Sequence, residues 1–225
     1  MTADAAITTE KKNKLINRYS FREEIFNSVT HGIGALLSIA ALVILVAFAS
    51  IKGDAWRIVS FSIYGFTLFF LYLSSTLYHS VFHEKTKRVL RVFDHAGIYL
   101  LIAGSYTPIT LVLMRDAWGW TIFALIWSMA LLGIVLKIIS LERMKVFSIV
   151  LYLAMGWLIV IAMKPMLAAF PEGLFTWLLI GGLAYTFGLI FYVCKKIPFN
   201  HGIWHLFVLG GSAVHYFGFL RYLAL

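Results

Sequence analysis

The chain has 225 residues, of which 61% are hydrophobic and only 13% are charged. Soluble domains carry a charge on roughly 25% of their residues, so this composition excludes an ordinary soluble protein and indicates an integral membrane protein. The formal net charge of +9 could suggest a nucleic-acid partner, but basic residues beside membrane spans ordinarily report orientation. Their distribution along the chain accounts for the excess, and no nucleic-acid partner is expected.

Seven apolar segments follow one another along the chain. A helix needs roughly 20 apolar residues to cross about 30 Å of hydrocarbon. Segments of about this length lie at 29–51, 58–81, 92–113, 119–139, 146–163, 174–194 and 201–222. The sequence therefore predicts an all-α membrane protein, a bundle of seven transmembrane helices within residues 29–225. Short connections make consecutive helices antiparallel neighbours.

Residues 1–28 are predicted to form a cytoplasmic N-terminal segment. In this segment Ser20 and Glu23 have the spacing of a capping box, which starts a helix. The helix is either a short one lying at the membrane surface or an extension of the first span, and the sequence leaves both open. No cleaved signal peptide is expected, because no short apolar stretch with a small-residue cleavage site is present.

The basic residues divide unequally between the two sides of the predicted bundle. Fourteen of the 19 Lys and Arg residues lie on the side of the N-terminus. The other side holds Lys52, Arg57, Arg115, Lys164 and Arg221. The positive-inside rule places the richer side in the cytoplasm. The N-terminus is therefore predicted to be cytoplasmic and the C-terminus extracytoplasmic.

Three histidines lie at one predicted depth, near the cytoplasmic ends of their spans. His79 is close to the end of the second span, and His201 and His205 stand one turn apart at the start of the seventh. A polar imidazole in an apolar segment needs a partner, because lipid offers none. Three protein ligands with an open fourth position are typical of catalytic zinc. The sequence predicts Zn²⁺ on His79, His201 and His205.

Asp94 is the one acidic residue within the predicted spans, and it falls at the same depth. It has three possible roles: a fourth ligand, a base that holds a water molecule, or an acceptor for an imidazole N–H. The second is favoured, because three neutral imidazoles leave the charge of the ion uncompensated. Ser75, one turn from His79, either hydrogen-bonds the same water or bonds back to its own helix.

The four remaining histidines are not expected to be ligands. His31, His83 and His95 are predicted to lie at the membrane interface or to support the ligands from outside the metal shell. His215 follows His205 by ten residues, about 15 Å along a helix, which is too far to share one ion.

Three motifs together resemble the progestin and adipoQ receptor superfamily, with the bacterial haemolysin III branch closest. They are Ser75 to His79, the segment that Asp94 opens, and His201 to His205. The resemblance covers about residues 31–222. It implies seven helices, zinc on the three histidines with water near Asp94, and a multi-pass protein of the bacterial inner membrane. It also implies ceramidase-like hydrolysis of lipid amides.

The leading functional hypothesis is a zinc-dependent intramembrane hydrolase of lipid amides or esters. Asp94 would be the base and Ser75 a polar support, with a membrane lipid as substrate or ligand. One alternative is a sensor in which zinc joins helices without turnover, and another is a haemolysin-like lytic protein. A retinal protein is excluded, because the last span has no lysine for a Schiff base. A G-protein-coupled receptor would have its N-terminus outside.

The charge asymmetry predicts the result of reporter fusions. A reporter after Lys87 is expected to be active in the cytoplasm, and one after Leu225 outside it. Paired alkaline phosphatase and fluorescent protein fusions measure both. The reverse pattern would contradict the predicted orientation.

Overall fold

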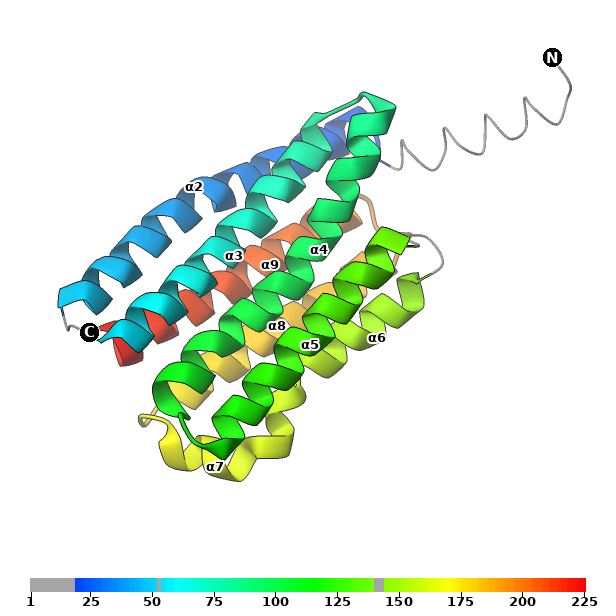
Figure 1. The fold of residues 1–225 in the computed structure, drawn as a ribbon. Helices are drawn as coiled ribbons and strands as arrows, with labels where there is room; N and C mark the ends of the chain where they lie inside the picture. Colours follow the sequence, from blue (N-terminus) through cyan, green and yellow to red (C-terminus); the bar gives the residue numbers. More distant parts are fainter. Residues whose placement is uncertain (1–18, 52–53, 140–143) are drawn as a thin grey trace, which may run out of the picture.

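The computed structural model describes residues 19–51, 54–139 and 144–225 of the chain, and the regular structure in this part is entirely helical (Figure 1). The α-helices are α2 (Phe21–Ile51), α3 (Ala55–Ser80), α4 (Glu84–Pro108), α5 (Ala117–Ile139), α6 (Lys145–Gly156), α7 (Met163–Ala169), α8 (Leu174–Val193) and α9 (Asn200–Phe219). Two π-helical turns extend α4 and α9, at Ile109–Leu113 and Leu220–Ala224, and a 3₁₀ turn at Leu158–Ala162 joins α6 to α7. Within these described residues, seven stretches are long and apolar enough to cross a membrane. The predicted all-α architecture and number of candidate spans are confirmed.

The helices run up and down the bundle, and the last one returns beside the first. α2 packs on α3, α3 on α4, α4 on α5 and α8 on α9, while α9 also contacts α2 (Figure 1). The starts of α2, α4, α6 and α9 lie at the same end of the bundle as the ends of α3, α5 and α8. We term it the histidine end. Residues far apart in the sequence thus reach one depth there.

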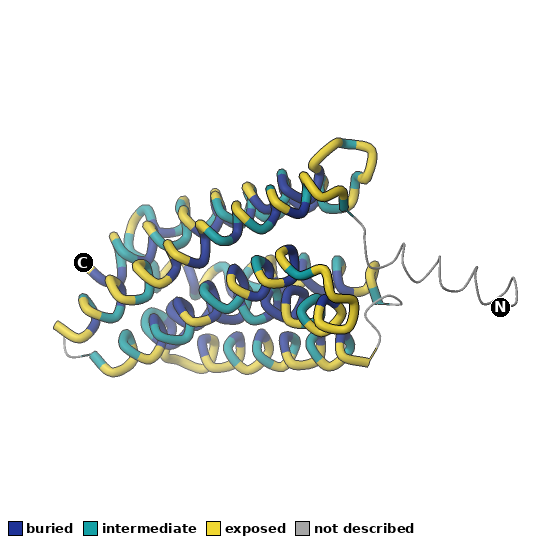
Figure 2. Tube along the Cα trace, turned by 90° about the horizontal axis from the view of Figure 1, so that it is seen from above, coloured by how far each residue is buried: buried dark blue, intermediate teal, exposed yellow. Residues whose placement is uncertain are grey.

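The outer surface of the bundle is apolar. Buried positions face inward and exposed positions follow the outer sides of the helices (Figure 2). Large apolar side chains such as Leu36, Ile51 and Ile139 are more than 70% exposed. Such a surface is stable against lipid tails and unstable against water, in agreement with the candidate spans.

α2 begins eight residues before the predicted start of the first span, at Phe21. The predicted capping box is present: the Ser20 N–H donates to Glu23 Oε2 at 2.8 Å, and the Glu23 N–H donates to Ser20 Oγ at 3.3 Å. From this cap α2 continues unbroken to Ile51, so the polar start is an extension of the first span. Glu24 thereby becomes a bundle residue that is only 3% exposed. Glu24, which lies before the predicted first span, thus joins Asp94 as a second buried acid.

The fifth span, predicted as one helix over 146–163, is interrupted after Gly156. The hydroxyl of Tyr106 on α4 donates to the Gly156 carbonyl at 3.0 Å and accepts from the Ile159 N–H at 3.1 Å. A side chain that takes up backbone groups in this way replaces the helical ladder. The chain therefore passes through a 3₁₀ turn before it resumes as α7.

α3 and α4 approach each other closely because glycines face the neighbouring helix. A Cβ on Gly97 would lie 3.0 Å from the Leu71 Cα, and one on Gly104 would lie 2.1 Å from Thr67 Oγ1. Small residues permit such contacts between spans. This close packing places the last turns of α3 directly beside the first half of α4, where Asp94 lies.

Candidate metal centre

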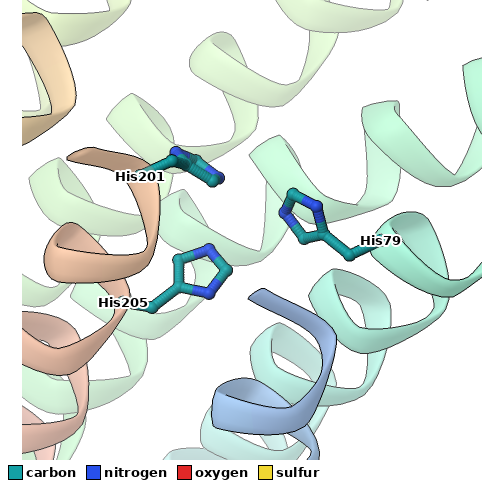
Figure 3. A group of neighbouring side chains, drawn as sticks. All are labelled: His79, His201 and His205. Atoms are coloured by element: carbon teal, nitrogen blue, oxygen red, sulfur yellow. The ribbon is translucent and has the colours of Figure 1, made fainter. Parts of the chain in front are cut away.

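Three imidazoles converge inside the histidine end. His79 comes from the last turn of α3, and His201 and His205 come from the first turns of α9, with their rings pointing toward one another (Figure 3). One donor nitrogen from each ring lies within 4.8 Å of the other two. Two nitrogens on one zinc ion, at about 2.0–2.1 Å each, are at most about 4.2 Å apart. Small side-chain rotations would therefore bring the three donors to one ion, and the cluster could bind a metal.

Hydrogen bonds at the far side of two rings fix which nitrogen faces the cluster. His79 Nδ1 lies 2.6 Å from Glu24 Oε2, and His205 Nδ1 lies 3.2 Å from the Asn27 carbonyl oxygen. Each contact holds the proton on Nδ1 and leaves the lone pair on Nε2. His79 Nε2 is buried and has no hydrogen-bond partner in the described part of the chain. A buried acceptor of this kind is a ready metal donor.

Glu24 is a functional residue that the sequence analysis missed. Its second oxygen, Oε1, lies 2.9 Å from Lys87 Nζ, and Lys87 is itself only 2% exposed. Lys87 Nζ also donates to the Tyr78 and Val81 carbonyls at 3.1 Å each. These carbonyls belong to the end of α3, where backbone acceptors lack helical partners and a cation is favourable. The Glu24–Lys87 pair therefore holds both the His79 ring and the helix turn that carries it.

Asp94 and Ser75 lie beside the cluster, as the spacing predicted. Ser75 is fully buried one turn before His79, and Asp94 on α4 is 9% exposed. The Ser75 hydroxyl faces the Asp94 carboxylate closely enough to interact with it, but Ser75 Oγ makes no hydrogen bond of normal geometry to any described residue. Asp94 does not belong to the group of donor atoms that lie within 4.8 Å of one another. Its position favours contact with a bound water or substrate over direct ligation, and its role stays a prediction.

The other histidines occupy four different environments. His31 is buried and stacks on His205, with ring centroids 3.5 Å apart. His83 is exposed and caps the start of α4. His95 lines the cavities beside the cluster. His215 Nε2 lies 3.1 Å from the Leu178 carbonyl oxygen, toward the other end of the bundle.

An apolar cavity of about 140 Å³ leads from the cluster into the bundle. At the histidine end its wall includes Asp94 and His205, and farther along it includes Trp157, Gly182 and His215. A second apolar cavity of about 120 Å³ shares these last three residues. Together the two cavities form an apolar path that runs from the three histidines along the interior of the bundle. We term this path the apolar cavity.

Seven candidate spans around a buried three-histidine cluster define a multi-pass membrane protein with a candidate intramembrane metal centre. The chain belongs to the haemolysin-III related family, whose sequence model matches residues 19–216. The predicted membership of the progestin and adipoQ receptor superfamily is thereby confirmed.

Relatives of this chain occur in bacteria and animals. It is 52% identical over 204 residues to the hemolysin-3 homolog of Bacillus subtilis (strain 168), covering 91% of this chain and 96% of that protein. It is 48% identical over 214 residues to hemolysin-3 of Bacillus cereus, with coverage of 95% and 97%. It is also 32% identical over 210 residues to the human monocyte to macrophage differentiation factor, with coverage of 89% and 84%.

The three-histidine cluster predicts a defined metal content. Protein purified without chelator is expected to carry about one zinc ion per chain, and the triple alanine variant of His79, His201 and His205 is expected to carry none above background. Elemental mass spectrometry measures both. The control is His83→Ala, which removes an exposed histidine at the same end and should keep full zinc. Unchanged zinc in the triple variant would refute the site.

Glu24→Gln tests whether the buried carboxylate supports the metal ligand. The change removes the charge that faces His79 and leaves Lys87 buried without its counter-ion, so zinc should bind about 10–100-fold more weakly. Competition with a chromophoric chelator gives the affinity.

A second variant separates this effect from loss of stability. Lys87→Met in the Glu24→Gln background removes the unpaired charge, which is strongly destabilising when buried, and also the bonds to the Tyr78 and Val81 carbonyls. It should therefore restore the melting temperature in part. Zinc affinity should remain weak. If affinity recovers together with the melting temperature, Glu24 acts only through folding.

Proposed function

We propose that this protein is a zinc-dependent intramembrane hydrolase that cleaves lipid amide or ester bonds. The observation that carries the proposal is the junction of a buried three-imidazole cluster with the apolar cavity, with a carboxylate and a hydroxyl beside it. Three neutral nitrogen ligands with room for a fourth, non-protein ligand are the donor set of catalytic zinc sites. An aqueous active site would not need an apolar cavity at its side.

The residues present fit a zinc ion, because the donor nitrogen of His79 is buried and oriented by Glu24. When bound, zinc would lower the pKa of a coordinated water to about 7 and polarise a substrate carbonyl. The chain supplies the rest of the chemistry. In the proposed reaction Asp94 accepts a proton from the attacking water and delivers it to the departing nitrogen or oxygen.

The water oxygen forms a bond to the acyl carbon, and the bond from that carbon to the amide nitrogen or ester oxygen breaks. The leaving group takes the proton that Asp94 carried, and a fatty acid and an amine or alcohol are released. The Ser75 hydroxyl, which is buried beside Asp94, would donate a hydrogen bond to the oxygen that becomes negative.

The apolar cavity supports a lipid as the substrate. Its wall is made largely of aliphatic and aromatic side chains and reaches from Asp94 toward His215, which suits an acyl chain whose carbonyl lies at the cluster. The basic excess on the side of the N-terminus supports a cytoplasmic position of the histidine end. The relatives from Bacillus support a bacterial cell membrane as the location.

Asp94→Asn tests the hydrolase directly. The amide keeps the shape of the side chain but cannot accept the proton, so the rate of fatty-acid release should fall by roughly 100-fold or more while zinc content stays near one per chain. The assay measures fatty acid released by purified protein from ceramides, other lipid amides and phospholipid esters.

Asp116→Asn is the matched control. Asp116 lies at the opposite end and accepts a hydrogen bond from the Gly119 N–H, which asparagine also does, so activity should be unchanged. If zinc-loaded wild-type protein releases no fatty acid from the whole panel, the hydrolase is refuted and the zinc-joined sensor takes its place.

A further inference from the structure

A third cavity lies on the other side of the three-histidine cluster, and it is larger than either of the two that form the apolar cavity. It has a volume of about 710 Å³ and occupies the histidine end, between α4, α6 and the connection from α8 to α9. It shares His201, Asp94, His95 and Tyr192 with the wall of the apolar cavity. The two cavities therefore meet at the candidate metal centre, one of them polar and the other apolar.

Basic side chains dominate the charge of this larger cavity, which we term the basic vestibule. Four of its six charged lining residues are basic: Arg91, Lys145, Lys195 and Lys196. The acidic ones are Glu23 and Asp94, and the Glu23 carboxylate is engaged in the capping box with Ser20. The cations come from three separate elements of the chain, so they surround the vestibule rather than follow one helix.

Membrane topology alone does not explain this arrangement. The positive-inside rule accounts for basic residues at one end of a bundle but not for their position around a cavity. Lys85 and Arg88 lie at the same end, on α4, and are exposed, as Lys145, Lys195 and Lys196 also are. Neither lines the vestibule. These two residues provide a comparison, because they carry the same charge at the same end of the bundle but lie outside the vestibule wall.

We propose that the basic vestibule binds the phosphate of a lipid headgroup while the chain of that lipid occupies the apolar cavity. Basic pockets between transmembrane helices bind anionic headgroups in this way, and lysine ammonium groups suit phosphate as point charges. A lipid placed so has its linkage between headgroup and chain at His201 and Asp94, where the two cavities meet. This inference rests on the proposed function for its reactive bond, and it names the substrate class as phosphate-bearing lipids.

The test measures binding without turnover. Native mass spectrometry of the full-length, zinc-loaded protein in neutral detergent would follow two probes of equal chain length, an alkyl-ether lysophosphatidic acid and the corresponding alkylglycerol. Neither probe has a bond that the proposed reaction cleaves. Lys195→Gln/Lys196→Gln should bind the phosphate probe about ten- to thirtyfold more weakly than wild type, the scale of about 1 kcal/mol for each lysine near an anionic lipid surface. Binding of the alkylglycerol should not change.

Lys85→Gln/Arg88→Gln is the matched control and should bind both probes like wild type. Equal losses in the two double variants, or no loss in either, would overturn the proposal. Displacement of the phosphate probe by an equal concentration of inorganic phosphate would assign the vestibule to a free anion and overturn the lipid part. Fatty-acid release from neutral amides together with unchanged probe binding in Lys195→Gln/Lys196→Gln would refute the vestibule and leave the hydrolase intact. If wild-type protein binds the phosphate probe, the Lys195→Gln/Lys196→Gln variant binds it more weakly, and no lipid is hydrolysed, the hydrolase would be refuted and the vestibule would stand.

Discussion

A carboxylate buried among three helices fixes the geometry of the histidine end. Moving a charge out of water is costly, and a buried carboxylate persists only where both oxygens have partners. Glu24 has them, with His79 Nδ1 at 2.6 Å and Lys87 Nζ at 2.9 Å. Because these residues belong to α2, α3 and α4, satisfying one side chain sets the depth of three helices relative to one another. Lys87 adds to this by holding the last carbonyls of α3.

α2 carries none of the three candidate ligands, yet it orients two of them. Glu24 holds the His79 ring, and one turn further along α2 the Asn27 carbonyl oxygen lies 3.2 Å from His205 Nδ1. His31, another turn along, stacks on His205. A metal ligand whose second nitrogen is held in this way keeps one tautomer and one ring orientation. The residues that would bind the ion therefore lie on α3 and α9, whereas residues that orient their rings lie on α2.

Much of the architecture could be predicted because bilayer thickness limits the length of a span and lipid forces polar side chains into the interior. The seven spans and the convergence of the three histidines followed from these constraints. Hydropathy could not show that Glu24 and Lys87 are buried, since their burial depends on a contact between three helices. A local signal was present nonetheless: Glu24, Asn27 and His31 have the spacing of one helix face. No local sequence signal marked the interruption after α6, because its cause is the Tyr106 hydroxyl, about 50 residues earlier in the chain.

The order of the chain has a consequence for how the protein matures. Glu24 and His79 lie on the first two spans, whereas His201 and His205 lie on α9. Domains and segments emerge from the ribosome with the N-terminal part first, so the pairing of Glu24 with His79 can form early in biogenesis. A metal ion can be enclosed only after the final helix has joined the others. Binding of a metal by all three histidines would thus be a late event, and a bound metal would mark chains that have completed assembly rather than chains that have merely entered the membrane.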